Sequence, residues 1–432
     1  MGKITVGLIS NDTVGKKMAG PGMRYWELAK GLSRIEGLEV VLFVPGSCDL
    51  ATKGVTVRSY RPRKQSSVLK QINGIDVIIA QSLTPLVLRG IKGRGIKYIA
   101  DLYDPIPVEI LEYFRDASGR TQKYAFRYAV VELLNQLHGA DHILYATGAQ
   151  KDLYLGMLTG DGILRPDQYY KDPSLKRYMT EAPFGLSRDA LKGTDNRVVA
   201  GRLPAIKPSD KLVYWGGGIW NWFDPLTVIK AIEILSRKRS DIKLLFLGTR
   251  HPNPNIAMEA MCQKAVEYAK KKGLMDRYVF FNFGWTPFEE RVNFLARADI
   301  GVSAHFDILE TRFSFRTRVL DYLWAGIPIV TTRGDAMANL VEKHKLGAVI
   351  DYEDSRGMAA ALEKMADDSS LRRKIKVNIS KIKPLFCWDL ICDRIAPIIK
   401  EDRFRSPRPY GMRRWRLLFL FYLNGFLKRY IS

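Results

Sequence analysis

Three arginines gather where the sequence predicts the start of a helix. Arg312, Arg316 and Arg318 follow an expected buried strand at 300–303, just before or within an expected helix at 316–324. The first turn of a helix carries partial positive charge, so cations are unfavourable there unless an anion compensates them. We therefore predict a bound polyanion such as a diphosphate, stabilised mainly by Arg316 and Arg318. The alternative is an internal network in which carboxylates of the chain itself neutralise the arginines.

A triple glycine offers a second place for an anion. Gly216 to Gly218 follow an expected strand at 211–215, and Asp224 and Pro225 suit the cap and first turn of the next helix. Backbone N–H groups in such a loop can surround a phosphate, although a tight turn beside core tryptophans is the alternative. The candidates for substrate binding in this loop are Gly217, Gly218, Trp220 and Asn221.

A similar but weaker signal precedes the first helix. Gly20 and Gly22 lie between an expected strand at 4–9 and an expected helix at 23–35, and Arg24 falls in the first turn of that helix. These residues could bind a phosphate or carboxylate, or form an ordinary turn. The spacing is not Gly-x-Gly-x-x-Gly, so it does not favour a dinucleotide.

Carboxylates follow other expected strands. Asp101 and Asp104 come after the strand at 97–100 and could orient an acceptor hydroxyl group or cap the next helix. We expect Glu310 and Asp321 to accept hydrogen bonds from sugar and ribose hydroxyls. Further substrate-binding candidates are Arg250 and His305. No Asp-x-Asp pair ends a strand. His138 and His142 are four residues apart, but Gly139 interrupts any helix between them and no third ligand is near, so we predict no metal and no cofactor.

Alternating strands and helices must position these residues. Such alternation predicts parallel sheets with helices on both faces. The expected strands are 4–9, 39–44, 76–80, 97–100, 142–146, 211–215, 242–247, 278–281, 300–303 and 327–331. The expected helices are 23–35, 107–114, 121–137, 225–237, 256–272, 287–296, 316–324 and 355–367. Because the pattern restarts near residue 206, we predict an α/β chain of two doubly wound, Rossmann-like domains, at 1–205 and 206–384, followed by a crossover helix at 385–402.

Composition limits the broad class of the protein. The chain has 432 residues, 47% of them hydrophobic, and a net charge of +23. This composition excludes disordered, collagen-like and coiled-coil classes. Four cysteines without a Cys-x-x-Cys pair suit a reducing cytoplasm, and no apolar run is long enough to span a bilayer. The positive charge predicts an anionic partner, for which lipid head groups, phosphorylated substrates and nucleic acid are the candidates.

The last thirty residues differ from the rest of the chain. The segment 403–432 holds eight Arg or Lys and no acidic residue, and Leu417–Leu423 is an uninterrupted apolar and aromatic run. A helix over this run is too short to cross a bilayer but suits the head-group layer. We predict a basic membrane-associating tail, with a helix buried against the N-terminal domain as the alternative.

The stretches 216–225 and 310–328 together resemble glycosyltransferases of the GT-B fold, specifically the large retaining family four, and the resemblance extends over nearly the whole chain. The stretches 101–105 and 183–186 look like a bacterial subgroup that builds surface polysaccharides. The resemblance implies two Rossmann-like domains that face each other across a cleft. It also implies a nucleotide-diphosphate sugar held mainly by the C-terminal domain, retention of configuration and no metal requirement.

This sequence departs from the family pattern at three places. The family usually carries two glutamates eight residues apart; Asp321 matches the second, Phe313 stands at the first, and Glu310 takes over its place. Trp220 and Asn221 replace the usual Arg and Lys, so diphosphate binding moves to Arg316 and Arg318. Trp285 is then placed to contact the nucleobase, or else to pack beside a helix cap.

The predicted function is therefore transfer of a sugar from a nucleotide-diphosphate donor to a lipid-linked or growing glycan acceptor, as in lipopolysaccharide synthesis. We expect a cytoplasmic enzyme, peripheral on the inner face of the plasma membrane, that needs no nucleic acid. A sugar-nucleotide epimerase of the same fold and a basic nucleic-acid-binding protein are the alternatives.

Overall fold

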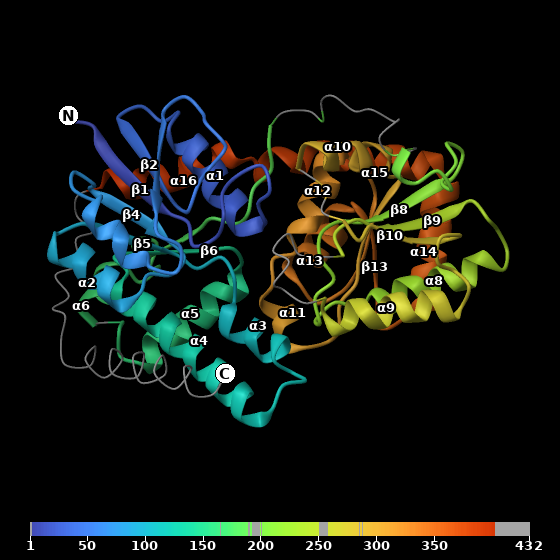
Figure 1. Cartoon of the computed structure of the whole chain (residues 1–432), viewed down its shortest axis with the longest axis horizontal. Coiled ribbons are helices and arrows are strands. Elements are labelled where there is room, and N and C mark those ends of the chain that lie inside the picture. The colour runs from blue at the N-terminus through green and yellow to red at the C-terminus, as the bar shows by residue number, and fades with distance from the viewer. Residues whose placement is uncertain are drawn as a thin grey trace. The chain divides into compact units, whose positions relative to one another are not determined.

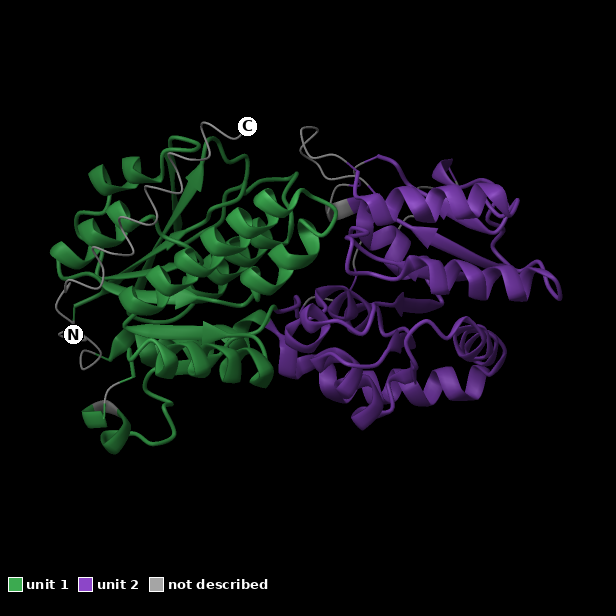
Figure 2. Cartoon of the chain, turned by 90° about the horizontal axis from the view of Figure 1, so that it is seen from below, with its two compact units in different colours: residues 1–184, 388–432 green, residues 185–387 purple. Residues whose placement is uncertain are grey.

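The computed structural model describes residues 2–164, 166–188, 191, 199, 201–249, 258–284, 286 and 288–401. The chain forms two compact units, shown in separate colours in Figure 2. Unit 1 contains the residues up to Phe184 together with the final helix, and unit 2 spans Gly185–Cys387. The predicted tail at 403–432, Arg250 and Trp285 lie outside the described residues.

Unit 1 is a seven-stranded parallel sheet in the order β3-β2-β1-β4-β5-β6-β7. Its strands are β1 (Ile4–Ile9), β2 (Leu38–Pro45), β3 (Val55–Tyr60), β4 (Val77–Ala80), β5 (Lys97–Asp101), β6 (His142–Tyr145) and β7 (Met179–Glu181). Its helices are α1 (Gly20–Leu32), η1 (Gln65–Lys70), α2 (Pro85–Gly93), α3 (Ile106–Tyr113), α4 (Gly119–Gly139), α5 (Gly148–Gly160), α6 (Pro166–Lys171) and α16 (Trp388–Lys400). Helices α1 and α16 pack together against β1, whereas α2 and α4 cover the other face at β5 (Figure 1).

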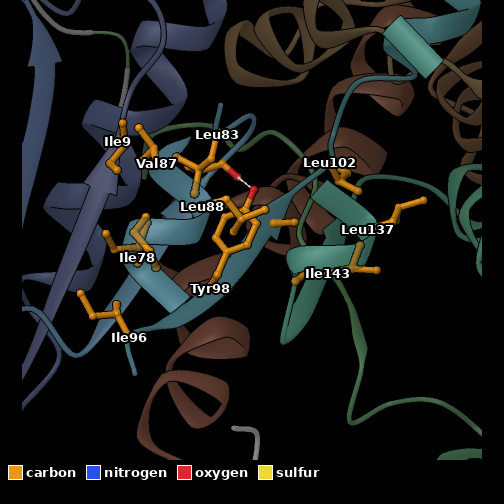
Figure 3. Packing of buried hydrophobic residues seen from close by; sticks show 14 of the residues in the cluster. Ile9, Ile78, Leu83, Val87, Leu88, Ile96, Tyr98, Leu102, Leu137 and Ile143 are labelled. Carbon is orange, nitrogen blue, oxygen red and sulfur yellow. Dashed lines mark hydrogen bonds between the residues drawn. The ribbon is translucent and has the colours of Figure 1, made fainter. Parts of the chain in front are cut away.

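Short runs of Val, Ile and Leu make the central strands of unit 1, because both faces of a parallel sheet are covered. Every side chain of β4 and β5 is buried. Figure 3 shows how Ile78 and Tyr98 from these strands pack with Leu88 of α2 and Leu137 of α4. This packing holds in place the carboxyl ends of the strands, where Asp101 ends β5 and Asp104 follows it.

Unit 2 repeats this plan with a six-stranded parallel sheet in the order β10-β9-β8-β11-β12-β13. Its strands are β8 (Lys211–Trp215), β9 (Ile242–Phe246), β10 (Val279–Phe281), β11 (Ile300–Ser303), β12 (Ile329–Thr332) and β13 (Gly347–Ile350). Its helices are α8 (Pro225–Ser236), α9 (Ala260–Lys271), α10 (Phe288–Arg297), α11 (Leu309–Phe313), α12 (Thr317–Ala325), α13 (Ala336–His344), α14 (Ser355–Asp367), α15 (Ser369–Ile382) and η2 (Lys383–Phe386). Helices α8, α9 and α14 cover one face, and α10 and α12 lie on the other (Figure 1).

Both sheets have the strand order of a Rossmann fold, so the predicted α/β class with two doubly wound domains is confirmed. The unit boundaries fall at 184/185 and 387/388, whereas we predicted 205/206 and 384/385. The difference arises because the Leu186 N–H donates to the Phe386 carbonyl at 2.8 Å, which ties the chain after Phe184 to unit 2. Within the described ranges, no helix is both long enough and apolar enough to cross a bilayer.

Candidate active site

In each sheet the strand order reverses beside the first strand, and ligands of Rossmann folds bind at the carboxyl ends of the strands flanking this point. In unit 2 the point lies between β8 and β11. The triple-glycine loop follows β8, and residues 304–318 follow β11. An isolated bridge between Phe223 and His305 joins the two segments. The two segments that carry most of the unit 2 candidates therefore meet at one sheet edge.

The glycine loop has the geometry of an anion cradle. Gly217 is exposed and takes φ +77°, a left-handed conformation that favours glycine. A Cβ on Gly248 would lie 2.9 Å from the backbone carbonyl carbon of Gly217, so glycine at 248 lets the two loops approach. The Gly216 N–H donates to the Tyr322 hydroxyl at 3.1 Å. The described part of the chain offers no acceptor to the Gly217 and Gly218 N–H groups, which leaves both for a ligand.

Trp220 and Asn221 close one side of this loop. The Trp220 ring stacks on Trp222 with centroids 5.5 Å apart and planes at 5°, and Trp220 stays partly exposed. Asn221 Oδ1 accepts the Met261 N–H at 3.1 Å and so holds the start of α9. The predicted binding role fits the half-exposed indole better than the amide.

Arg318 is a buried cation beside the glycine loop. One guanidinium nitrogen donates to the Gly218 carbonyl at 2.9 Å, and the guanidinium carbon lies 4.3 Å and 4.0 Å from the Trp215 and Phe223 ring centroids. The other terminal nitrogen, Nη1, is buried without a hydrogen-bond partner. Burial lowers the pKa of Arg318 to about 10, so the group stays protonated at neutral pH. Among the described residues no carboxylate forms an ion pair with it, and the geometry therefore suits an external anion.

Arg316 behaves differently, and the prediction that it binds the diphosphate needs correction. Its terminal nitrogens donate to both carboxylate oxygens of Glu310, at 2.8 Å and 2.7 Å, and both side chains are buried. Ser314 also donates to Glu310, and Asp335 lies 3.4 Å from Arg316 Nε. For Arg316 and Glu310 the structure thus favours the internal network that we named as the alternative. Glu310 is 1% exposed, so it offers no surface to a donor sugar here.

The His305 ring belongs to the same network and does not reach a ligand, contrary to the sequence prediction. Its side chain is fully buried, and Nε2 lies 2.9 Å from the Arg333 carbonyl and 3.2 Å from Asp335. Burial, helped by the charge of Arg316, lowers the pKa of His305 well below its usual value. A neutral imidazole that donates to the Arg333 carbonyl is the consistent state.

Asp321 lies on α12 beside the glycine loop. It accepts a hydrogen bond from Arg291 of α10 at 3.1 Å, and a Cβ on Gly216 would lie 3.7 Å from one of its oxygens. Burial raises the pKa of Asp321, whereas Arg291 and Arg318 act in the opposite direction. The carboxylate keeps partial exposure, so the predicted contact to ribose hydroxyls fits its position. Arg312 is exposed over the Phe313 ring and away from this cluster of contacts.

The pair Arg24 and Asp101 in unit 1 is internal, which corrects two predicted roles. Arg24 donates twice to Asp101, at 2.8 Å and 2.6 Å, and once each to the Ala182 and Pro183 carbonyls. Both side chains are fully buried. Burial opposes the charge of Arg24, yet the Asp101 carboxylate raises its pKa. Neither residue is available to an anion or an acceptor hydroxyl.

Asp104 remains a candidate on the acceptor side. It is partly exposed, and Gln81 donates to it at 3.2 Å. Burial raises the pKa of Asp104 to about 6. Gly22 has a packing role instead, because a Cβ there would collide with the Thr13 carbonyl. Gly20 is exposed at the start of α1, with open space where its Cβ would be.

The sequence reasoning missed Asp335 and Arg291. Asp335 follows β12 and caps α13 by accepting the Met337 and Ala338 N–H groups, both at 2.7 Å. An aspartate three residues after a buried strand, at the start of a helix, was the signal that could have found it. Arg291 gave no such signal, because it lies mid-helix and meets Asp321 only through the packing of α10 on α12.

Comparison with known proteins supports this assignment of the fold. Residues 210–368 match the family model of glycosyl transferases group 1. The structure resembles WaaG, a glycosyltransferase involved in lipopolysaccharide biosynthesis, with 15% identity, TM-score 0.63, and coverage of 91% of this chain and 99% of that one. It also resembles Anabaena Alr3699/HepE in complex with UDP and glucose, with 14% identity, TM-score 0.64 and coverage of 92% and 100%. For sucrose-phosphate synthase from Thermosynechococcus elongatus the identity is 15%, the TM-score 0.62 and the coverage 92% and 98%.

No curated protein sequence matches this chain. The solved structures are too distant in sequence to show more than the fold, which is that of GT-B glycosyltransferases. Residues 210–368 carry a group 1 glycosyl transferase domain, and the prediction of a glycosyltransferase is confirmed to that extent.

Proposed function

We propose that this protein transfers a sugar from a nucleotide-diphosphate donor to a lipid-linked or growing glycan acceptor, with retention of configuration. The observation that carries the proposal is Arg318, a buried cation with an unpartnered guanidinium nitrogen beside the Gly217–Gly218 amides. This arrangement lies at the reversal point of a Rossmann sheet, within a segment that matches group 1 glycosyl transferases.

Cleavage of the donor leaves a nucleoside diphosphate, so negative charge builds up on the leaving phosphate in the transition state. Preorganised donors aimed at developing charge lower the barrier most effectively where water is excluded. In the proposal Arg318 and the two glycine amides stabilise this charge, and no metal ion takes part. Asp321 binds the ribose hydroxyls, with Arg291 holding its carboxylate in place.

Asp104 is the proposed contact for the acceptor hydroxyl in unit 1. A carboxyl group whose pKa is about 6 is mostly ionised at neutral pH, so it can accept a hydrogen bond from a hydroxyl group. In the proposal Asp104 orients the hydroxyl, and the leaving phosphate accepts its proton.

Two observations support the proposed acceptor and location. The name of WaaG places that protein in lipopolysaccharide biosynthesis, and the net charge of +23 suits work at an anionic membrane. We propose a cytoplasmic enzyme, peripheral on the inner face of the plasma membrane. The basic tail at 403–432 remains the predicted anchor.

A nucleotide panel tests the proposed donor site. The midpoint of thermal unfolding is measured with UDP, GDP, ADP and dTDP, their sugars and the matching nucleosides. One diphosphate at a hundred times its Kd should stabilise the protein by about 2.7 kcal/mol, whereas its nucleoside should stabilise it far less. Indifference to every diphosphate would overturn the proposal. Isomerisation of a bound sugar nucleotide without acceptor would instead favour the epimerase alternative.

A further inference from the structure

Helices α3 and α4 of unit 1 form a projecting surface that is both apolar and basic. We call it the α3–α4 surface, and its exposed members are Leu111, Tyr113, Arg120, Lys123, Phe126 and Arg127. The two helices pack against each other, and the start of α4 points away from the sheet of unit 1 (Figure 1). These residues take no part in the Rossmann core or in the proposed donor site.

The apolar part of the surface is unusual for side chains facing water. Leu111, Tyr113 and Phe126 are 43%, 41% and 38% exposed. All buried residues of α4 come from Ala129 onward, so its first ten residues bury no side chain in the core although three of them are aromatic. Exposed apolar groups gathered in one place usually mark a binding surface.

The charged part points to an anionic partner. Arg120, Lys123 and Arg127 lie in the first three turns of α4, where no acidic residue occupies the first turn. Cations near a helix N-terminus are unfavourable without an opposing charge. Throughout the described chain these three side chains form no ion pair, and Asp116 is the only exposed carboxylate between Leu111 and Tyr128.

We propose that the α3–α4 surface docks on the head-group layer of an anionic lipid bilayer. Cations matched to lipid phosphates and side chains such as Leu111 and Phe126 that enter the acyl boundary are the two components of interfacial binding. Tyr113 suits the same layer, because its ring is apolar and its hydroxyl can stay hydrated. Nucleic acid would use the cations but gains little from an exposed leucine. The inference extends the proposed function, since a lipid-linked acceptor lies at such a surface.

Two variants of the full chain separate the components. The first replaces the charges, R120Q/K123Q/R127Q, and the second removes the apolar groups, L111S/F126S. The matched control is R373Q/K374Q/K376Q, which removes three exposed charges from α15 of unit 2. All proteins keep residues 403–432, so any contribution of the tail is the same in each.

Binding is measured by sedimentation with phosphatidylcholine vesicles that contain or lack phosphatidylglycerol. Each cation near a membrane surface contributes about fivefold to binding, so the charge variant should lose on the order of a hundredfold on anionic vesicles. The apolar variant should weaken binding to both kinds of vesicle, whereas the α15 control should change it less than about threefold.

If the α3–α4 variants bound anionic vesicles as well as the control does, the proposal would be overturned. It would also be overturned if these variants lost binding to nucleic acid or to a soluble protein but still bound vesicles like wild type. Thermal stabilisation by the nucleotide diphosphate is measured on every variant. It reports that the protein is folded, and it separates a failure of membrane docking from a failure of the proposed donor site.

Discussion

Substitution of Arg318 and Arg316 by methionine should have opposite consequences for folding and for ligand binding. The two residues are separated by one position in sequence, and both guanidinium groups are buried. Arg316 is bonded to Glu310, whereas Arg318 has no carboxylate partner among the described residues. The two variants therefore distinguish a buried arginine that stabilises the fold from one that binds a ligand.

The expected magnitudes follow from these contacts. R316M leaves the Glu310 carboxylate buried without its cation, and breaking a buried pair in this way costs about 3–5 kcal/mol of unfolding free energy. R318M loses one charge-assisted hydrogen bond, worth about 1.5–3 kcal/mol, and two contacts with aromatic rings. It also removes a desolvated charge and leaves an apolar side chain between Trp215 and Phe223. The unfolding free energy of R318M should stay within about 2 kcal/mol of wild type.

Nucleotide binding should show the reverse order. Hydrogen bonds between a guanidinium and a phosphate are charge-assisted and contribute about 1.5–3 kcal/mol each. Loss of Arg318 should therefore raise the Kd of the bound nucleoside diphosphate roughly a hundredfold. R316M, at a temperature where it remains folded, should bind within about tenfold of wild type.

Urea unfolding gives the stability of each variant, and isothermal titration calorimetry with the best nucleotide of the panel gives its Kd. R318K serves as the conservative control, because lysine keeps the charge but not the planar, bidentate group. An R318M protein that is as unstable as R316M and still binds nucleotide like wild type would falsify the assignment of Arg318. Such a result would make Arg318 a structural residue.

Three further predictions concern unit 1. R24M should destabilise the fold by about 3–5 kcal/mol through the unpaired Asp101 carboxylate, and the double variant R24M/D101L should recover part of this loss in urea unfolding. Because burial raises the folded-state pKa of Asp104 from 3.8 to about 6, its stabilising protonated form is complete below pH 4 and is lost as the pH rises through 6. D104N should therefore equal wild type in stability near pH 4 and exceed it by up to about 3 kcal/mol at pH 7.5; a pH-independent difference in urea midpoints would contradict this. G22A should lower the midpoint of thermal unfolding, since its Cβ meets the Thr13 carbonyl, whereas G20A, with open space at that Cβ, should not.

The strands that carry the core could be predicted because their apolar runs are short, continuous and rich in branched residues. The strands expected at 4–9, 211–215 and 300–303 have the observed bounds. Strand β3 was missed because this half-exposed edge strand mixes apolar residues with Thr56, Arg58 and Ser59. Strand β13 was missed because it is a half-exposed edge strand of only four residues. The helices that were missed as well are α2, α5, α6, α11, α13 and α15.

Residue spacing could locate the loops of the site but could not tell which charges meet a ligand. Arg24 and Asp101 are 77 positions apart and lie on different elements, so nothing local shows that β5 brings them together. A buried ion pair and a phosphate site need the same residue types at the same sheet edge. Only the tertiary structure shows that the guanidinium of Arg24 donates its hydrogen bonds to Asp101 and to two backbone carbonyls.

Arg316 and Arg318 show why even neighbouring positions diverge. Arg316 is the cap residue of α12 and Arg318 the second residue of the helix. Arg316 has the non-helical backbone angles of a cap (φ −72°, ψ 87°), whereas Arg318 lies within the helix, so the two side chains leave the backbone in different directions. Arg316 is thus directed to Glu310 and Asp335, and Arg318 to the Gly218 carbonyl of the loop after β8. A cluster of cations at a helix start predicts that an anion is required there, and only the tertiary contacts decide which cation receives one from the chain and which needs it from a ligand.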